Sequence, residues 1–288
     1  MQKWIVLALV ALTARVDAKE AVYDTKKKVW LTVSEVAADR PPGSVVVLGE
    51  EHFVDGSQKD PVSVRHHENQ LHWLQMMNLR AHEQDLEARL GLEFLEYPVQ
   101  AAVEDFRAGR LSEDEFKEKA GWGGNPFAPY GALIRSTPTR ALNIPLAVAR
   151  QVARGGPDSL SADLKAFLPP LWERGSDAYF ARFSDAMGGH VDPAGLERYF
   201  WAQCLRDDTM AWQAVQALTP HSFMTIVVGA FHVEFGHGLP ARLIRQGATS
   251  VHTMLQVYVE DFNDREDFVK PDPEYGDRAD YLWVYSLD

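Results

Sequence analysis

The order of the apolar runs constrains the fold of this chain more than any other feature. Long segments with helical periodicity separate the first four of six apolar runs that are typical of β-strands. The six runs are VVVLG from Val45, LGLEFLE from Leu90, RALNIPLAV from Arg140, FMTIVVGA from Phe223, SVHTMLQVYV from Ser250 and YLWVYSL from Tyr281. Alternating strands and helices are the pattern of an α/β protein, in which helices cover both faces of the sheet. The sequence therefore predicts an α/β fold with a mainly parallel β-sheet flanked by helices.

Two segments depart from this alternation. Residues from about 155 to 220 show only helical periodicity, which predicts a helical insertion that forms a smaller all-helical subdomain within a single domain of residues 19–288. The segment GWGGNPFAPYGALI, from Gly121 to Ile134, interrupts the helical pattern with glycines, prolines and aromatic residues. Such a segment is expected to be a loop that packs as a lid or forms a binding surface.

The first 18 residues predict a secretory signal peptide. Lys3 precedes an apolar stretch from Trp4 to Ala14, and small residues lead to an expected cleavage site after Ala18. The apolar stretch is short for a membrane span, so we expect export to the periplasm or secretion rather than an uncleaved anchor. The only cysteine is Cys204, far from the cleavage site, so the sequence predicts neither an intrachain disulfide nor a lipid-tethered N-terminus.

Charge and the missing motifs exclude several classes of function. The formal net charge is −12, from 29 Lys+Arg and 41 Asp+Glu, which disfavours nucleic acid and anionic membranes as partners. The sequence has no Walker loop, no GxSxG nucleophile elbow, no HExxH helix and no paired CxxC. Nucleotide binding and serine hydrolysis therefore lose their usual support.

Three predicted strands carry polar side chains at or near their carboxyl ends. The first run ends in GEEH, which supplies Glu50 and His52, and the fourth ends in GAFH, which supplies His232 with the same spacing after a glycine. Glu93 interrupts the second run, where a carboxylate is costly unless it is paired or functional. Because the carboxyl ends of parallel strands meet at one edge of a sheet, we expect these four side chains to share a crevice.

The segment VRHHENQLHW, from Val64 to Trp73, opens the helix that follows the first strand. We expect most of its polar residues to lie at the surface. The alternative interpretation is that Arg65 or His66 leans over the crevice as a ligand, as a hydrogen-bond partner of a ligand or as an anion contact.

The motifs also resemble those of a known family. LGEEH, LGLEF, ALNIPLAVARQVARG, AQCLRDDTMA and VVGAFHVEFGHGLPARL are similar, in this order, to motifs of ChaN-like proteins, the haem-binding members of the Tiki, ChaN and erythromycin-esterase superfamily. The similarity extends from Val45 to Leu243. The matching motif positions are Glu50, His52, Glu93, Asn143, Asp207 and His232.

The resemblance implies a parallel sheet flanked by helices, haem or haem-iron binding through an axial tyrosine, and a dimer around the cofactor. We assign the axial ligand to Tyr130, in the aromatic segment. Phe231 stands where the family more often has a second glycine, which predicts a reshaped pocket. The first hypothesis is therefore an exported protein of haem or iron uptake or handling. Its cofactor-binding residues would be His52, His66, Tyr130, Asn143 and His232.

Two alternatives stay open. In the second hypothesis the chain is an esterase or peptidase, in which Glu50 or Glu93 holds His52 as it activates water, and His232 stabilises charge. A divalent metal such as Zn or Mn, with His52, His232 and Glu93 as ligands, would serve the same reaction. In the third hypothesis the chain is a binding module whose polar cluster has only a structural role.

Overall fold

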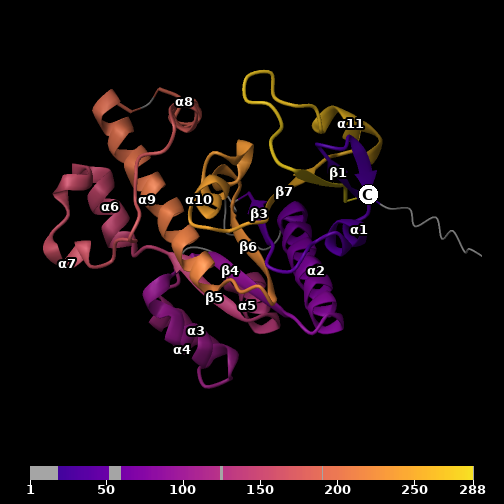
Figure 1. Ribbon diagram of the computed structural model, residues 1–288, viewed down its shortest axis with the longest axis horizontal. Helices are drawn as coiled ribbons and strands as arrows, with labels where there is room; N and C mark the ends of the chain where they lie inside the picture. The colour runs from indigo at the N-terminus through magenta and orange to yellow at the C-terminus, as the bar shows by residue number, and fades with distance from the viewer. Residues whose placement is uncertain (1–18, 52–59, 124–125, 190, 288) are drawn as a thin grey trace, which may run out of the picture.

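The computed structural model describes residues 19–51, 60–123, 126–189 and 191–287, in which one β-sheet lies between layers of helices (Figure 1). The sheet has eight strands in the order β2-β1-β8-β7-β3-β6-β4-β5. The strands are β1 (Glu20–Asp24), β2 (Val29–Leu31), β3 (Val45–Glu50), β4 (Glu87–Glu96), β5 (Thr139–Asn143), β6 (Ser222–Gly229), β7 (Val251–Tyr258) and β8 (Tyr281–Tyr285). All pairs from β8 to β5 are parallel, and only β1 pairs antiparallel, with β8 and β2. The predicted α/β fold with a mainly parallel sheet is confirmed.

Eleven α-helices lie within the described residues. They are α1 (Val33–Ala38), α2 (Pro61–Glu83), α3 (Gln100–Arg107), α4 (Glu113–Ala120), α5 (Phe127–Ser136), α6 (Leu146–Gly155), α7 (Ala162–Lys165), α8 (Asp177–Ala186), α9 (Pro193–Ala217), α10 (Leu239–Arg245) and α11 (Arg265–Phe268). The two longest begin where an aspartate caps the first turn and a proline occupies its first position: Asp60 and Pro61 for α2, Asp192 and Pro193 for α9. Both features favour a helix start.

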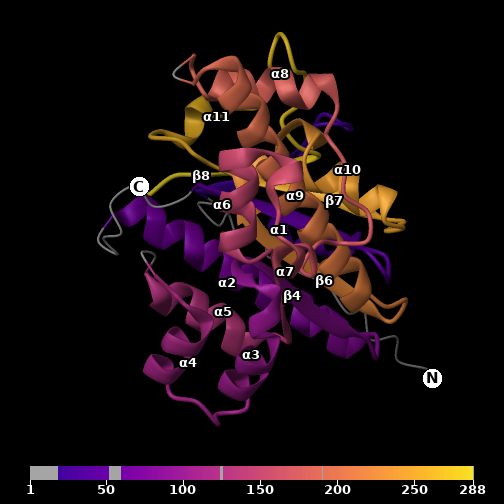
Figure 2. The ribbon, with the colours of Figure 1, turned by 90° about the vertical axis from the view of Figure 1, so that its left-hand side faces the viewer.

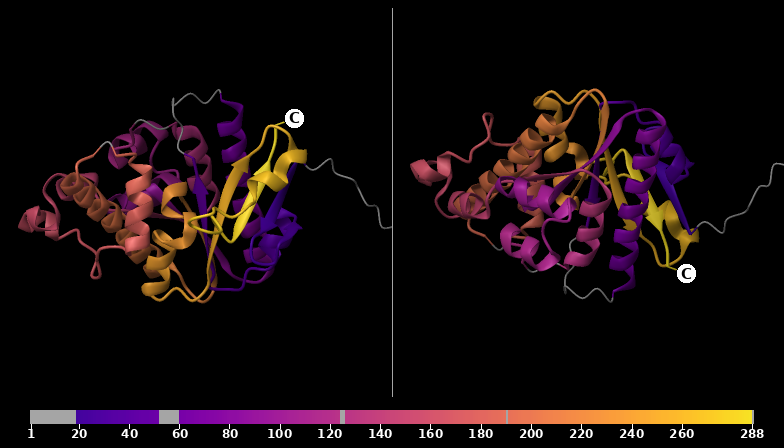
Figure 3. Two further views of the ribbon diagram at one scale, coloured as in Figure 1. Left: turned by 90° about the horizontal axis from the view of Figure 1, so that it is seen from above. Right: turned by 90° about the horizontal axis from the view of Figure 1, so that it is seen from below.

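The two faces of the sheet bury separate hydrophobic clusters. Apolar side chains of α1 to α5 pack on one face, against residues such as Leu48 and Leu92. Side chains of α9 and α10 pack on the other face, against residues such as Val47 and Ile226. Views from above and below show helices on both sides of the strands (Figure 3). Because neighbouring residues of a strand point to opposite faces, an uninterrupted apolar strand such as β3 requires this double cover.

The segment between α6 and β6 consists of helices and their connections in the part of the chain that the structure describes. Here α6 and α8 pack on the outer part of α9, around smaller clusters that include Val148 and Phe200 (Figure 2). The middle and the end of α9 instead pack on the sheet, so α9 joins the helical segment to the core.

Three local expectations differ from the structure. The run from Arg140 is a strand only as far as Asn143, because Pro145 precedes the first residue of α6 and cannot donate to a strand ladder. The aromatic segment contains a helix, α5, after a glycine at position 121 with φ of 62° ends α4. The strands β1 and β2 were not expected. The predicted signal peptide, residues 1–18, lies outside the described residues, and no described helix is long and apolar enough to cross a bilayer.

Candidate functional site

Four neighbouring strands end at one place in the sheet. β3, β6, β4 and β5 are consecutive in the strand order, and all their pairings are parallel. Their carboxyl ends supply Glu50, His232, Glu93 and Asn143 from a single edge of the sheet, the location at which open α/β sheets bind their ligands. His52 lies outside the described residues.

Gly49 allows the end of β3 to approach the end of β6. A Cβ atom at Gly49 would lie 2.5 Å from a methyl carbon of Leu255 and 3.2 Å from the Cα of Ala230. A side chain at this position would therefore push away the short 3₁₀ turn Ala230–His232, which carries His232. The glycine before Glu50 thus permits close packing of two strand ends, rather than a sharp turn.

Glu93 is held where the regular pairing of β4 stops. The last pair of β4 with β6 is Leu92 with Val227, and the register of β4 with β5 shifts after Leu92. Beyond that point the Gly229 N–H donates to Glu93 Oε2 at 2.7 Å. The other oxygen, Oε1, accepts from Arg206 Nη2 at 2.5 Å. These contacts stabilise the carboxylate of a side chain that is only 3% exposed.

The imidazole of His232 lies between two carboxylates. Its Nδ1 is 2.6 Å from Asp207 Oδ1, and its Nε2 is 3.3 Å from Glu93 Oε1. Burial lowers the pKa of this imidazole, but Glu93 and Asp207 raise it more strongly, to about 9. His232 is therefore an imidazolium at neutral pH, and both of its ring nitrogens have acidic partners.

Three polar residues of α9 complete this cluster. Gln203 Nε2 lies 3.0 Å from His232 Nδ1, Arg206 contacts Glu93, and Asp207 is fully buried beside His232. Asp207 was expected from the resemblance, whereas Gln203 and Arg206 were not. Their signal in the sequence is the spacing of polar residues along a helix that is otherwise largely apolar, because residues three and four apart share a face.

Tyr179 and Phe231 lie beside this cluster and contact each other. Tyr179 donates its hydroxyl proton to Asp207 Oδ2 at 2.9 Å, and its ring stacks on Phe231 with centroids 5.8 Å apart. The Arg182 guanidinium lies over the Phe231 ring, at 4.1 Å from its centroid, and also donates to the Phe231 carbonyl. Contacts with Tyr179 and Arg182 therefore hold the Phe231 ring in place.

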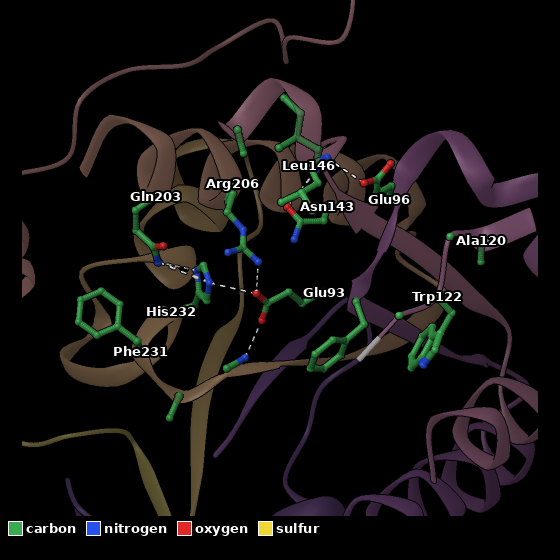
Figure 4. Close-up of a pocket in the computed structure, with 17 residues that line it drawn as sticks. Glu93, Glu96, Ala120, Trp122, Asn143, Leu146, Gln203, Arg206, Phe231 and His232 are labelled. Carbon is green, nitrogen blue, oxygen red and sulfur yellow. Dashed lines mark hydrogen bonds and ion pairs between the residues drawn. The ribbon is translucent and has the colours of Figure 1, made fainter. Parts of the chain in front are cut away.

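The cluster forms one wall of an open cavity of about 530 Å³ (Figure 4). Arg206, His232 and Glu93 lie together on one side, whereas Trp122 lies on the opposite side. Phe94 and Phe231 add aromatic surface, and the lining includes Asn143 and Glu96. Asn143 accepts from the Ile144 N–H at 2.9 Å, and Glu96 accepts from the N–H of the first residue of α6 at 2.8 Å. The cavity thus combines a charged wall with an aromatic one.

Glu50 lies behind this cavity rather than in its lining. Its carboxyl group accepts from the Tyr130 hydroxyl and from Gln70 Nε2, both at 2.5 Å. Burial raises the pKa of Glu50 to about 7, although these two hydrogen bonds lower it. Burial and the charge of Glu50 also raise the pKa of Tyr130 well above its usual range.

The histidines of α2 lie apart from the cavity. His66 is 6% exposed, and its Nε2 has no hydrogen-bond partner among the described residues. Burial, with a smaller effect from His67, lowers the pKa of His66 to about 3, so its ring is neutral. His67 donates through Nδ1 to the Ser63 carbonyl and packs edge-on against the Tyr130 ring. Arg65 pairs with Glu20 at 3.0 Å.

The described residues contain no group of three or more His, Cys, Asp or Glu side chains that could hold a metal ion. His232 and Glu93, two of the expected metal ligands, are instead 3.3 Å apart in an ion pair. The third, His52, lies outside the described ranges, so the proposed metal set stays a prediction.

The fold is similar to that of a solved ChaN structure. The chain aligns with ChaN of Campylobacter jejuni, whose structure is described as showing cofacial haem binding, with a TM-score of 0.67 and 14% identity. The alignment covers 92% of this chain and 96% of that one. At this identity the similarity shows the fold alone.

Two further structures are more distant. A mutant of the erythromycin esterase EreC in its open conformation aligns with a TM-score of 0.39 and 11% identity, over 82% of this chain and 75% of that one. The type III effector HopBA1 aligns with a TM-score of 0.38 and 10% identity, over 89% and 92% of the two chains. A search of curated proteins finds no match.

The sequence itself matches a family over most of its length. Residues 36–243 match the family described as haem-binding uptake, Tiki superfamily, ChaN. This range includes β3 to β6 and all the cavity residues named above. The chain therefore belongs to the ChaN family of haem-binding uptake proteins in the Tiki superfamily.

Proposed function

We propose that this protein binds haem in the cavity at the carboxyl ends of β3 to β6, as an exported protein of haem or iron uptake or handling. The observation that carries the proposal is the cavity of about 530 Å³, in which Trp122 lies opposite the charged side chains of Arg206, His232 and Glu93. Its volume lies within the usual range of small-molecule sites, about 300–1,000 Å³. Membership of the ChaN family, and the cofacial haem binding described for ChaN of C. jejuni, support the same ligand.

The lining suits the chemistry of a porphyrin. The macrocycle is flat and apolar, which matches the rings of Phe94, Trp122 and Phe231. Haem also carries two carboxylates. Arg206, whose side chain is 34% exposed, has a guanidinium that can donate to a carboxylate in addition to Glu93. Haem iron bound in this cavity would supply the redox and ligand-exchange chemistry of the group.

We propose Tyr199, rather than Tyr130, as the axial ligand. Tyr130 is 1% exposed and donates its hydroxyl proton to Glu50, so a phenolate at this position would lie against a carboxylate. Tyr199 is 41% exposed, and it stands four and seven residues before the cavity residues Gln203 and Arg206 on α9. Tyr199 is not among the residues that line the cavity, but residues with this spacing share one face of a helix, so we propose that Tyr199 reaches bound haem from the preceding turns of α9.

Titration of the purified protein with hemin tests the proposal. We expect a saturable shift of the Soret band, because a bound phenolate changes the electronic environment of the iron. Tyr199→Phe should alter the shifted spectrum and weaken binding, and Trp122→Ala should weaken binding. The matched control is Tyr258→Phe, an exposed tyrosine on β7 outside the cavity. If no saturable shift is seen with the unmodified protein, haem binding is refuted; if Tyr130→Phe changes the spectrum and Tyr199→Phe does not, the ligand assignment is wrong.

Two further parts of the proposal concern assembly and location. We propose that two copies of the chain associate around bound haem, which predicts a doubling of molar mass by light scattering when hemin is added. We also propose that residues 1–18 direct export and are removed. Mass spectrometry of the protein from the cell envelope and the medium should then give a mature chain that begins at Lys19. A full-length chain confined to the cytoplasm would contradict export.

One observation favours the hydrolase as a second candidate. Glu50, at the end of β3, has a pKa of about 7, which suits a group that exchanges a proton at neutral pH. The imidazolium of His232 can stabilise a developing negative charge, but it is not a base at that pH. Assays of His52→Ala and Glu50→Gln with ester and peptide substrates, with and without Zn²⁺ or Mn²⁺, test this candidate. Absence of turnover by the unmodified protein under all these conditions would exclude it for those substrates.

A further inference from the structure

A second cleft lies at the opposite edge of the sheet. Its volume is about 640 Å³, and it forms where the end of α2, the helix α3 and the end of α9 meet the beginnings of β4 and β5. Parallel strands begin at the edge away from their carboxyl ends, so this cleft is separate from the haem cavity. The charged side chains in its lining are Arg89, Arg107, Arg140, His82, Glu87 and Glu104.

Two of the three arginines form no ion pair with any described residue. Arg107 donates through Nε to the Ile134 carbonyl at 3.0 Å, and Arg140 donates through Nη2 to the Gln213 side chain. Neither forms an ion pair within the part of the chain that the structure describes. In addition, the Arg140 Nε is buried and has no hydrogen-bond partner. Partial removal of a guanidinium from water is costly, and here the charge of Glu104 opposes that cost without forming an ion pair. A bound anion would offset more of it.

Arg107 and Arg140 line the same cleft, and the same carboxylate acts on both. Burial lowers the pKa of both Arg107 and Arg140, and for both the opposing charge is Glu104. The carboxylate of Glu104, on α3, therefore acts on both arginines, one on α3 and one on β5. The other acid, Glu87, is already paired with Arg89 at 2.5 Å. The cleft thus keeps an excess of positive charge in a chain whose net charge is −12.

We infer that this cleft binds a small phosphate-bearing molecule, whose phosphate group accepts hydrogen bonds from Arg107 and Arg140. A tetrahedral phosphate presents three terminal oxygens and can bridge two guanidinium groups that arrive from different elements, here α3 and β5. A planar carboxylate more often pairs with one guanidinium fork. The volume of the cleft leaves room for the rest of a small molecule, and neither the family nor the haem proposal requires this site.

Isothermal titration calorimetry with pyrophosphate tests the inference, with citrate as the carboxylate probe of similar charge. We expect saturable binding of pyrophosphate that is tighter than that of citrate and that weakens with added salt. Arg107→Gln and Arg140→Gln should each lower the affinity about tenfold or more, because each removes charge-assisted hydrogen bonds. The control is Arg154→Gln, at an exposed arginine in the last turn of α6 that should leave the affinity unchanged.

Absence of saturable pyrophosphate binding, or an equal loss of affinity in all three variants, would overturn the site. Tighter binding of citrate than of pyrophosphate would overturn the phosphate assignment. Arg107 is exposed, so its variant should fold even if Arg140→Gln does not. Both variants should keep the Soret shift with hemin, which distinguishes failure of this site from failure of the haem proposal.

Discussion

The pairing of His232 with two buried carboxylates predicts a defined loss of stability at alkaline pH. The imidazole has a pKa of about 9 in the folded protein, against 6.5 for the unperturbed group. Each tenfold change in proton affinity is worth about 1.4 kcal/mol, so the folded state stabilises the imidazolium by a net of about 3 kcal/mol, the attraction of Glu93 and Asp207 minus the cost of burial. The His232 side chain is 5% exposed, so solvent screens this energy little.

The direction of the effect follows from proton binding. Between pH 6.5 and 9 the folded chain keeps the proton on His232 and the unfolded chain loses it, so stability falls as the pH rises. The contribution is complete below pH 6.5 and is lost by the time the pH passes about 9. His232→Gln removes the titrating group, and the variant should lack this part of the pH dependence.

Urea unfolding followed by tryptophan fluorescence measures the effect. We expect the free energy of unfolding of the unmodified protein to decline relative to that of His232→Gln by about 3 kcal/mol from pH 6 to pH 9. Taking the difference between the two proteins cancels the other titrating groups. His72→Gln, at an exposed histidine of α2, is the control and should follow the unmodified protein. If the difference between the unmodified protein and His232→Gln stays constant with pH, the imidazolium between two acids is refuted.

Three other predictions concern buried groups near the strand ends. The pKa of Glu50 is raised from 4.5 to about 7, so the folded chain binds this proton more tightly than the unfolded chain, and stability falls as the pH rises through this window. The free energy of unfolding of Glu50→Gln, measured from pH 4 to 8, should lack this fall. Identical slopes of unfolding free energy against pH for both proteins would contradict the prediction. Gly49→Ala should destabilise the chain by about 1–3 kcal/mol in thermal unfolding, because its methyl group would lie 3.2 Å from the Ala230 Cα. The control is Gly123→Ala, whose methyl group would meet only a carbonyl oxygen at 4.0 Å, and its melting temperature should stay near that of the unmodified protein. Burial raises the pKa of the Cys204 thiol to about 12, so a disulfide reagent at pH 8 should modify it only after unfolding, and rapid reaction of the native chain would show that it is accessible.

The sequence was sufficient to predict which side chains meet at one edge of the sheet, because strand ends follow a simple geometric rule. Glu50, Glu93, Asn143 and His232 each stand at or near the end of an apolar run, and parallel pairing of β3, β6, β4 and β5 brings these ends together. The rule needs only the identity of the strands, which their apolar runs reveal.

The contribution of α9 could not be predicted in the same way. The sequence shows that Gln203 and Arg206 share a face of a helix, but not which part of the sheet that face meets, since this depends on how α9 packs on β5 and β6. Tertiary contacts also decide whether Tyr130 is accessible: it is a buried residue of α5, and its hydroxyl donates to Glu50. The helix α5 itself was missed because its glycine and proline residues indicate a loop when tertiary packing is ignored.

The charge cluster around His232 also determines how the protein should respond to ionic strength. Glu93, Asp207, Arg206 and the His232 imidazolium carry two negative and two positive charges, so the cluster is neutral as a whole. Mobile ions screen exposed pairs, such as Lys117 with Asp114, whose side chain is 92% exposed. They do not enter between His232 and its buried partners Glu93 and Asp207. Concentrated sodium chloride should therefore weaken the pairs on the surface of the molecule and leave the alkaline stability loss assigned to His232 at nearly its low-salt size.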